Sequence, residues 1–160
     1  MIHDSNKRLV AMRFTNVEAE IGPGSDSKHG GGSVDTEVKM AVSELDGSEN
    51  TATVTITAKG TPQGATEDNF AFRISITGVA LWDWSGELPT PEFLRNDATI
   101  YELCYALHTL IVGEVTRLAI GLGFPGVALS WNPGPEPVPQ KKPRASSPRT
   151  NKSRSMANKG

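Results

Sequence analysis

The residues that could carry catalysis or bind a metal are few in this sequence. It contains three histidines, His3, His29 and His108, and a single cysteine, Cys104. Cys104 and His108 are four residues apart, so in a helix they would share one face, where a thiol and an imidazole could pair for nucleophilic catalysis. No third group at a recognisable spacing would orient the histidine, and two ligands do not make a zinc site. We therefore favour a structural pair, a core cysteine beside a partly exposed histidine.

Two other motifs also lack the context that chemistry requires. The glycines at 30–32 do not follow a buried strand or open a helix, and no Lys-Ser or Lys-Thr pair follows them, so a phosphate loop is not predicted. Glu114 lies inside an apolar helical segment and could be a buried acid, but Arg117 three residues later favours a surface ion pair. The sequence therefore predicts a protein that is not an enzyme, with no catalytic residue, metal site or cofactor.

Composition and charge divide the chain into two parts. Of its 160 residues 37% are hydrophobic and 21% are charged, as expected for one soluble domain. Residues 1–132 contain 9 Lys and Arg against 17 Asp and Glu, a net charge of −8, whereas residues 133–160 contain 7 against 1, a net charge of +6. The second part is rich in proline and basic residues and has no apolar periodicity. Residues 133–160 are therefore predicted to form a disordered tail.

The composition also sets expectations about partners and location. The acidic body argues against nucleic acid as its partner, although the tail could bind RNA or an acidic protein surface as readily as remain solvated. No apolar run approaches the ~18 residues of a membrane helix, so no membrane insertion is predicted. The single cysteine excludes an internal disulfide, and residues 1–8 contain no apolar secretory region. We expect a cytoplasmic protein.

The period-two alternation of apolar and polar residues predicts four strands. A glycine-rich segment at about 22–33 is expected to be a flexible loop between the first two. In the fourth strand the positions facing away from the core become apolar at Val79 and Leu81, which predicts that both faces of the sheet are covered there. The predicted strands are 9–21, 34–45, 51–60 and 70–84.

A single long helix is predicted from Thr99 to Ile120, with Asn96 or Asp97 as its N-cap. One apolar stripe is enough for a helix that covers one face of a four-stranded sheet, yet this helix has a second apolar stripe. Burial against another subunit would account for the second stripe, so self-association is predicted. The expected interface residues are Tyr101, Tyr105 and Val112.

Large apolar residues gather at the end of the fourth strand and in a short strip beyond a Gly-Phe-Pro-Gly hinge after the helix. Core packing would account for any one of them, but a shared apolar groove accounts for them together, because aromatic rings give a large contact area at low entropic cost. The residues are Leu81, Trp82 and Trp84 in the strand, and Phe124, Val127, Leu129 and Trp131 around the hinge and in the strip.

On these segments the chain resembles the SecB export-chaperone family, over roughly Leu9 to Trp131. The most telling stretch is "YELCYALHTLIVGEVTRLAIGLGFPGVALSWNP", which is similar to the family's long helix, its helix-ending Gly-Phe-Pro and the apolar loop beyond. The segment "FAFRISITGVALWDWSG" is similar to the family's long fourth strand. The resemblance implies an oligomeric α+β fold for a SecB-like domain at 1–132, a four-stranded antiparallel sheet packed on a long C-terminal helix.

The resemblance also implies an activity. SecB proteins are ATP-independent chaperones, or holdases, that bind unfolded polypeptides in apolar grooves as homotetramers built as dimers of dimers. In protein export they deliver clients to the SecA motor through an acidic sheet face, which the net charge of the body would fit. The groove residues named above would then be the client-binding residues.

The sequence departs from the family after the apolar strip. SecB proteins usually continue with a second helix and an acidic tail, whereas here Pro133, Pro135, Pro137 and Pro139 forbid a regular helix and the tail is basic. This difference leaves room for a SecB-like chaperone of a toxin–antitoxin system, with an antitoxin as partner. The alternative from another class is an oligomeric adaptor or structural protein whose basic tail binds nucleic acid or an acidic partner.

Overall fold

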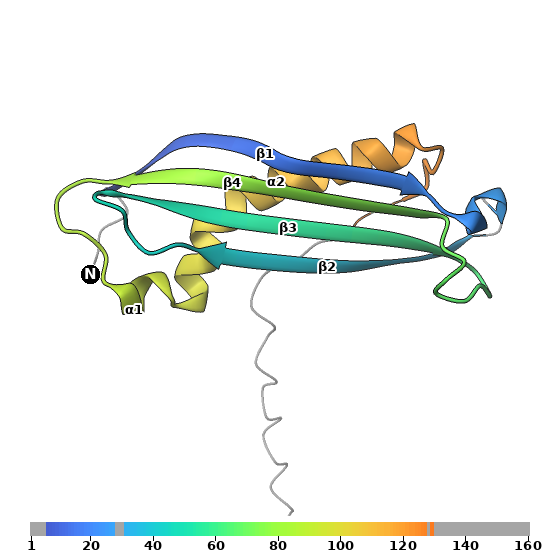
Figure 1. Cartoon of the computed structure of the whole chain (residues 1–160), viewed down its shortest axis with the longest axis horizontal. Coiled ribbons are helices and arrows are strands. Elements are labelled where there is room, and N and C mark those ends of the chain that lie inside the picture. The colour runs from blue at the N-terminus through green and yellow to red at the C-terminus, as the bar shows by residue number, and fades with distance from the viewer. Residues whose placement is uncertain (1–5, 28–30, 128, 130–160) are drawn as a thin grey trace, which may run out of the picture.

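The computed structural model of the chain describes residues 6–27, 31–127 and 129. Within these residues an antiparallel sheet has the strand order β1-β4-β3-β2, and a long helix crosses one of its faces (Figure 1). The predicted α+β fold, a four-stranded sheet with a long C-terminal helix, is confirmed. The strands are β1 (Lys7–Ile21), β2 (Gly32–Val42), β3 (Glu49–Pro62) and β4 (Phe72–Trp84), followed by helices α1 (Pro91–Leu94) and α2 (Asp97–Gly121).

The core lies between the sheet and α2. Alternate residues of the two central strands point toward the helix, because successive side chains of a strand lie on opposite faces. On α2 the buried residues recur at helical spacing on the side that meets these strands. The fully buried apolar residues include Val54 and Ile56 of β3, Ile74 and Ile76 of β4, and Leu103, Leu107, Ile111 and Val115 of α2.

Both ends of α2 have well-defined caps. At its start the side chain of Asn96 accepts a hydrogen bond from the amide of Ala98 at 3.0 Å, so Asn96 and not Asp97 is the N-cap. At its end Gly123 has a φ of +94°, and the amide of Phe124 donates to the carbonyl of Ala119 at 3.0 Å. This arrangement is a Schellman motif, which turns the chain sharply and sends Phe124 back toward the core.

The outer face of the sheet, opposite α2, is polar in its centre. Hydroxyl groups pair across the two central strands, Thr55 with Thr77 at 2.9 Å and Thr57 with Ser75 at 3.1 Å. Val79 and Leu81 also lie on this face and are half-buried, but no described segment covers them, contrary to the expectation of two covered faces.

Charges on the outer face are nearly balanced. Among the described residues six acids and five bases point outward from the four strands, so the acidity of the body does not concentrate on this face. It lies instead mainly in the loops and on the helices. The acids are Glu18, Glu20, Asp35, Glu37, Glu49 and Asp83, and the bases are Arg8, Arg13, Lys39, Lys59 and Arg73.

The segment predicted as a loop at about 22–33 contains more regular structure than expected. A 3-10 helix, η2, spans Pro23–Ser27, and β2 already begins at Gly32. The amides of Gly22 and Gly24 donate to the carbonyls of Ala71 and Phe70 at 2.9 and 2.8 Å, which ties η2 to the start of β4.

Helix α2 is long and apolar enough to cross a membrane by length and composition. A core helix with one side packed on a sheet meets the same criterion. Here 39% of the apolar stretch is buried, on the side of α2 that packs against β3 and β4.

Candidate functional site

A groove of about 570 Å³ lies where β2 begins, β3 ends and α2 terminates. Its walls combine apolar side chains with bare glycine backbone. The main contributors from the sheet are Gly32, Val34, Gly60, Pro62 and Phe72, and those from the post-helix segment are Gly123, Phe124, Pro125, Gly126 and Val127.

The floor of the groove depends on a glycine. A Cβ atom at Gly60 would lie 2.3 Å from Cε1 of Phe72, so only glycine lets this ring lie across β3. Phe124, directed inward by the helix-ending turn, packs on the same ring with the two ring centroids 4.9 Å apart and tilted by 44°. Phe72 is only 2% exposed and forms the covered base of the groove, so the half-buried Phe124 is the ring that the groove leaves accessible.

The opposite end of the sheet is closed. Trp84 is only 4% exposed, and its Nε1 donates to Oδ1 of the buried Asn50 at 2.9 Å. Its ring also meets Phe93 of α1 edge-on, with centroids 6.4 Å apart. Trp82 is half-buried, and its Nε1 donates to the carbonyl of Leu103 at 3.1 Å. Both indoles therefore have partners within the domain.

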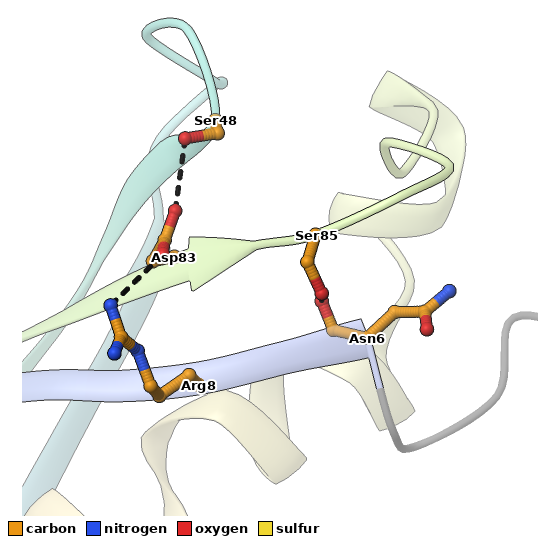
Figure 2. A network of polar contacts seen from close by, with 5 residues as sticks. All are labelled: Asn6, Arg8, Ser48, Asp83 and Ser85. Atoms are coloured by element: carbon orange, nitrogen blue, oxygen red, sulfur yellow. Dashed lines mark hydrogen bonds and ion pairs between the residues drawn. The ribbon is translucent and has the colours of Figure 1, made fainter.

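Polar contacts fasten the corner of the sheet beside Trp84, as Figure 2 shows. The carboxylate of Asp83 accepts from Ser48 at 2.9 Å and from Arg8 at 3.3 Å. The amide of Ser85 donates to the carbonyl of Asn6 at 2.8 Å. These contacts join the start of β1, the turn before β3 and the end of β4.

The structure thus separates the residues that were expected to share one groove. Trp82 and Trp84 lie toward the other end of β4 from Phe72, about 33 and about 40 Å away at the usual rise per residue of a strand. Within one chain they therefore do not neighbour this groove, because most of the length of β4 lies between them, and their role in client binding stays a prediction. Leu81 points to the outer face, away from α2, and cannot reach the groove either.

The post-helix strip fits the predicted groove better. Phe124 and Val127 line it, and Leu129 is half-buried against the core next to it. Trp131 lies outside the described residues. The residues that sequence reasoning missed are Gly60 and Phe72, which the period-two pattern placed inward, as part of an ordinary core. A strand glycine directly opposite a phenylalanine was the available signal.

Cys104 and His108 lie in the helix–sheet interface and not at the groove. Burial raises the pKa of the Cys104 thiol to about 11, so the reactive thiolate is suppressed. Burial also lowers the pKa of His108, which is 3% exposed and not partly exposed as expected. No cluster of potential metal ligands occurs in the described part of the chain. The burial of Cys104 and His108 supports a structural role for this pair.

The predicted interface stripe lies along the exposed side of α2. Tyr105 is 53% exposed, whereas Tyr101 and Val112 are half-buried, and the two tyrosine rings meet edge-on at 5.8 Å. Thr109 and Thr116 share this side, and their hydroxyls donate to backbone carbonyls one turn earlier, at 3.0 and 2.9 Å. The stripe therefore presents mainly rings and methyl groups.

The surface pair Glu114 and Arg117 is present as predicted. Nε and Nη2 of Arg117 donate to the two carboxylate oxygens of Glu114 at 2.9 and 2.5 Å. The hydrogen bond from Arg117 lowers the pKa of Glu114, so this acid stays ionised on the surface. This geometry is that of the predicted surface ion pair.

Comparisons with known proteins give a likeness in fold. No family model matches the sequence, and no curated protein does. Among solved structures the fold is similar to the Mycobacterium tuberculosis Rv1957 SecB-like chaperone, determined in complex with a ChAD peptide from the Rv1956 HigA1 antitoxin. The TM-score is 0.58 at 16% sequence identity, and the match covers 80% of this chain and 91% of that one. At this identity the likeness shows the fold, which is SecB-like.

Proposed function

We propose that this protein is a cytoplasmic, ATP-independent chaperone that holds extended apolar segments of unfolded polypeptides. The observation that carries the proposal is the open groove beside Phe72 and Phe124, on a fold that a SecB-like chaperone shares. Rings and glycine backbone offer contact area without a fixed pattern of polar groups, which suits clients of varied sequence. The described residues contain no cluster of potential metal ligands.

We also propose that the active form is a homotetramer, a dimer of dimers. The support is the exposed stripe on α2 around Tyr105, whose hydroxyl-bearing neighbours already satisfy their hydrogen bonds within the helix. Repeating one groove per chain would let an unfolded client engage several grooves at once and raise its overall affinity without new contacts. Light scattering on the purified full chain should give the mass of four chains.

An antitoxin-dedicated chaperone is the second candidate. The solved neighbour holds an antitoxin peptide, so an apolar segment of an antitoxin is a fitting client for the groove. Delivery to the SecA motor finds less support, because the acidic sheet face expected for it carries nearly equal numbers of acids and bases among the described residues.

The test uses reduced, carboxymethylated α-lactalbumin, which stays unfolded in buffer. We expect the full chain to bind it, with or without ATP. Val127→Asp, which places a charge in the groove wall, should weaken binding about tenfold or more. Val79→Asp is the matched control, since Val79 is also half-buried but faces the outer side of the sheet. The control should bind normally.

Two results would contradict the proposal. Failure of the full chain to bind this protein and other unfolded test proteins would exclude a holdase. The second is an equal loss of client binding in Val127→Asp and Val79→Asp when circular dichroism shows that both variants are folded. This result would show that the groove is not the binding surface.

A further inference from the structure

The groove lies where the described chain runs into its proline-rich tail. Val127 forms part of the wall, and Leu129 packs against the core two residues later. Trp131 is two residues beyond Leu129, at most about 7 Å along the chain. Residues 131–139 therefore begin close to the groove that we propose as the client site.

The sequence of this segment has the properties of a client. In "WNPGPEPVP" every second residue from Pro133 to Pro139 is proline, which forbids a helix and favours an extended, polyproline-like chain of about 3.1 Å per residue. Trp131 and Val138 supply apolar side chains. Asn132-Pro133-Gly134 is a turn sequence that can reverse the chain. An extended segment that carries apolar side chains and can fold back suits the apolar lining of the groove, and Glu136 is its one charged residue.

The charges around the groove complement the residues that follow. Four acids occupy the segments that border it: Asp26 in η2, Asp35 next to Val34, and Glu67 and Asp68 in the loop between Pro62 and Phe72. All four are exposed, and none forms an ion pair with another residue of the described ranges. The bases Lys141, Lys142 and Arg144 come directly after the proline segment. Opposite charges at this spacing would hold the segment in place.

We propose that residues 131–139 occupy the groove of their own chain when no client is bound, and that clients bind by displacing them. The inference rests on the proposed function for its consequence, but not for the contact itself. It assigns Trp131 to the occupant of the groove and not to its wall. An attached segment has an effective concentration in the millimolar range, so even a weak contact fills the groove most of the time.

This internal competitor would set a threshold for capture. A groove that is nine-tenths occupied lowers the apparent affinity for a client about tenfold. Clients with one weak apolar segment would be refused, whereas clients that engage several grooves would displace several tails together. Raised salt would weaken the electrostatic part of the contact and favour client binding.

Paramagnetic relaxation in the full chain tests the contact directly. Val138→Cys is labelled with a nitroxide, while the buried Cys104, with its raised pKa, stays unlabelled. We expect strong broadening of the backbone amides of Gly31, Gly32 and Gly126, and recovery at high salt. Ser155→Cys, near the end of the tail, is the matched label position and should broaden them far less.

The same experiment has clear contrary outcomes. Equal weak broadening from both label positions would overturn the proposal. Broadening that persists at similar strength when nitroxide-labelled chains without ¹⁵N are mixed with unlabelled ¹⁵N chains would also overturn it, because the occupant would then be the tail of a second copy.

Client affinity tests the consequence. Trp131→Ser in the full chain should bind reduced, carboxymethylated α-lactalbumin about three- to tenfold more tightly than the unmodified chain. Unchanged or weaker binding would contradict competition by the tail. If no variant binds this client while Val138 still broadens the groove amides, the proposed function fails and the intramolecular contact stands.

Discussion

The two ends of β4 present buried aromatic side chains on the same face of the sheet, yet one end is closed by polar contacts and the other borders an open groove beside the half-buried Phe124. At the closed end Trp84 is buried against Asn50 and Phe93, beside the polar corner in Figure 2. At the open end Phe72 lies over Gly60, meets Phe124 and borders the groove. Trp84 and Phe72 belong to the same strand and point to the same face of the sheet. The segments that surround each ring therefore decide whether a groove forms beside it.

The difference follows from what each ring requires. An indole carries an N–H group that must find an acceptor when buried, and Asn50 on the neighbouring strand supplies one. Phenylalanine has no polar atom, so its ring can border a groove that is filled or empty without leaving a hydrogen bond unmade. A tryptophan with a fixed partner therefore favours a rigid corner, and paired phenylalanines over glycine favour an adaptable surface.

We expect the largest difference between the two ends of β4 when the main aromatic side chain at each end is removed and stability and client binding are measured. Trp84→Ala should lower the free energy of unfolding by about 3–5 kcal/mol, because it leaves a cavity and an unpaired buried Asn50. Phe124→Ala, at a half-buried position, should cost about half as much. Urea titration measures both. Binding of unfolded α-lactalbumin should fall about tenfold in Phe124→Ala alone.

Trp84→Phe is the control for the closed end, since it keeps a ring and removes only the N–H donor. It should fall between the unmodified chain and Trp84→Ala in stability. A folded Trp84→Ala protein that binds the client several-fold more weakly would show that the closed end belongs to the client surface after all.

Acid should test whether the two ends unfold together. His108 lies midway along α2, and burial lowers its pKa below the usual 6.5. The unfolded chain therefore binds the proton more readily, so stability is fully present above about pH 7 and falls as the pH drops below 6.5, by at most about 1.4 kcal/mol per pH unit. The pKa of Glu114 is lowered from 4.5, so its contribution is lost only at lower pH.

Urea titrations between pH 5 and 7.5 measure this slope, and His108→Gln should flatten it. In Trp131→Ser the remaining tryptophans are Trp82 and Trp84, so its fluorescence reports the closed end, and client binding by the same variant reports the open end. If the two signals are lost at different pH values while His108 is present, the ends are separate units. An unchanged slope in His108→Gln would assign the pH dependence to other groups.

Much of the fold was predictable because its signals are local. Period-two alternation identified the strands, and helical spacing with a cap at Asn96 identified α2, so the observed bounds differ by only a few residues. The groove was only half predictable. Gly123-Phe124-Pro125 is a local helix-ending signal, and it placed Phe124 correctly. Trp82 and Trp84 resembled groove residues in composition, but their partners, Asn50 and Leu103, come from distant segments that no local pattern reveals.

The two caps of α2 give the smallest and most discriminating comparison. Asn96→Ala removes the side-chain acceptor at the closed end and should cost about 1 kcal/mol of stability. Gly123→Ala places a Cβ at a φ of +94° and should cost about the same. Stability alone would not separate the two variants. Client binding should, because Gly123 directs Phe124 onto Phe72, so its replacement moves the groove wall, whereas Asn96 lies at the far end of the helix. We expect several-fold weaker binding in Gly123→Ala only, and equal binding by both variants would mean that the helix-ending turn does not shape the client site.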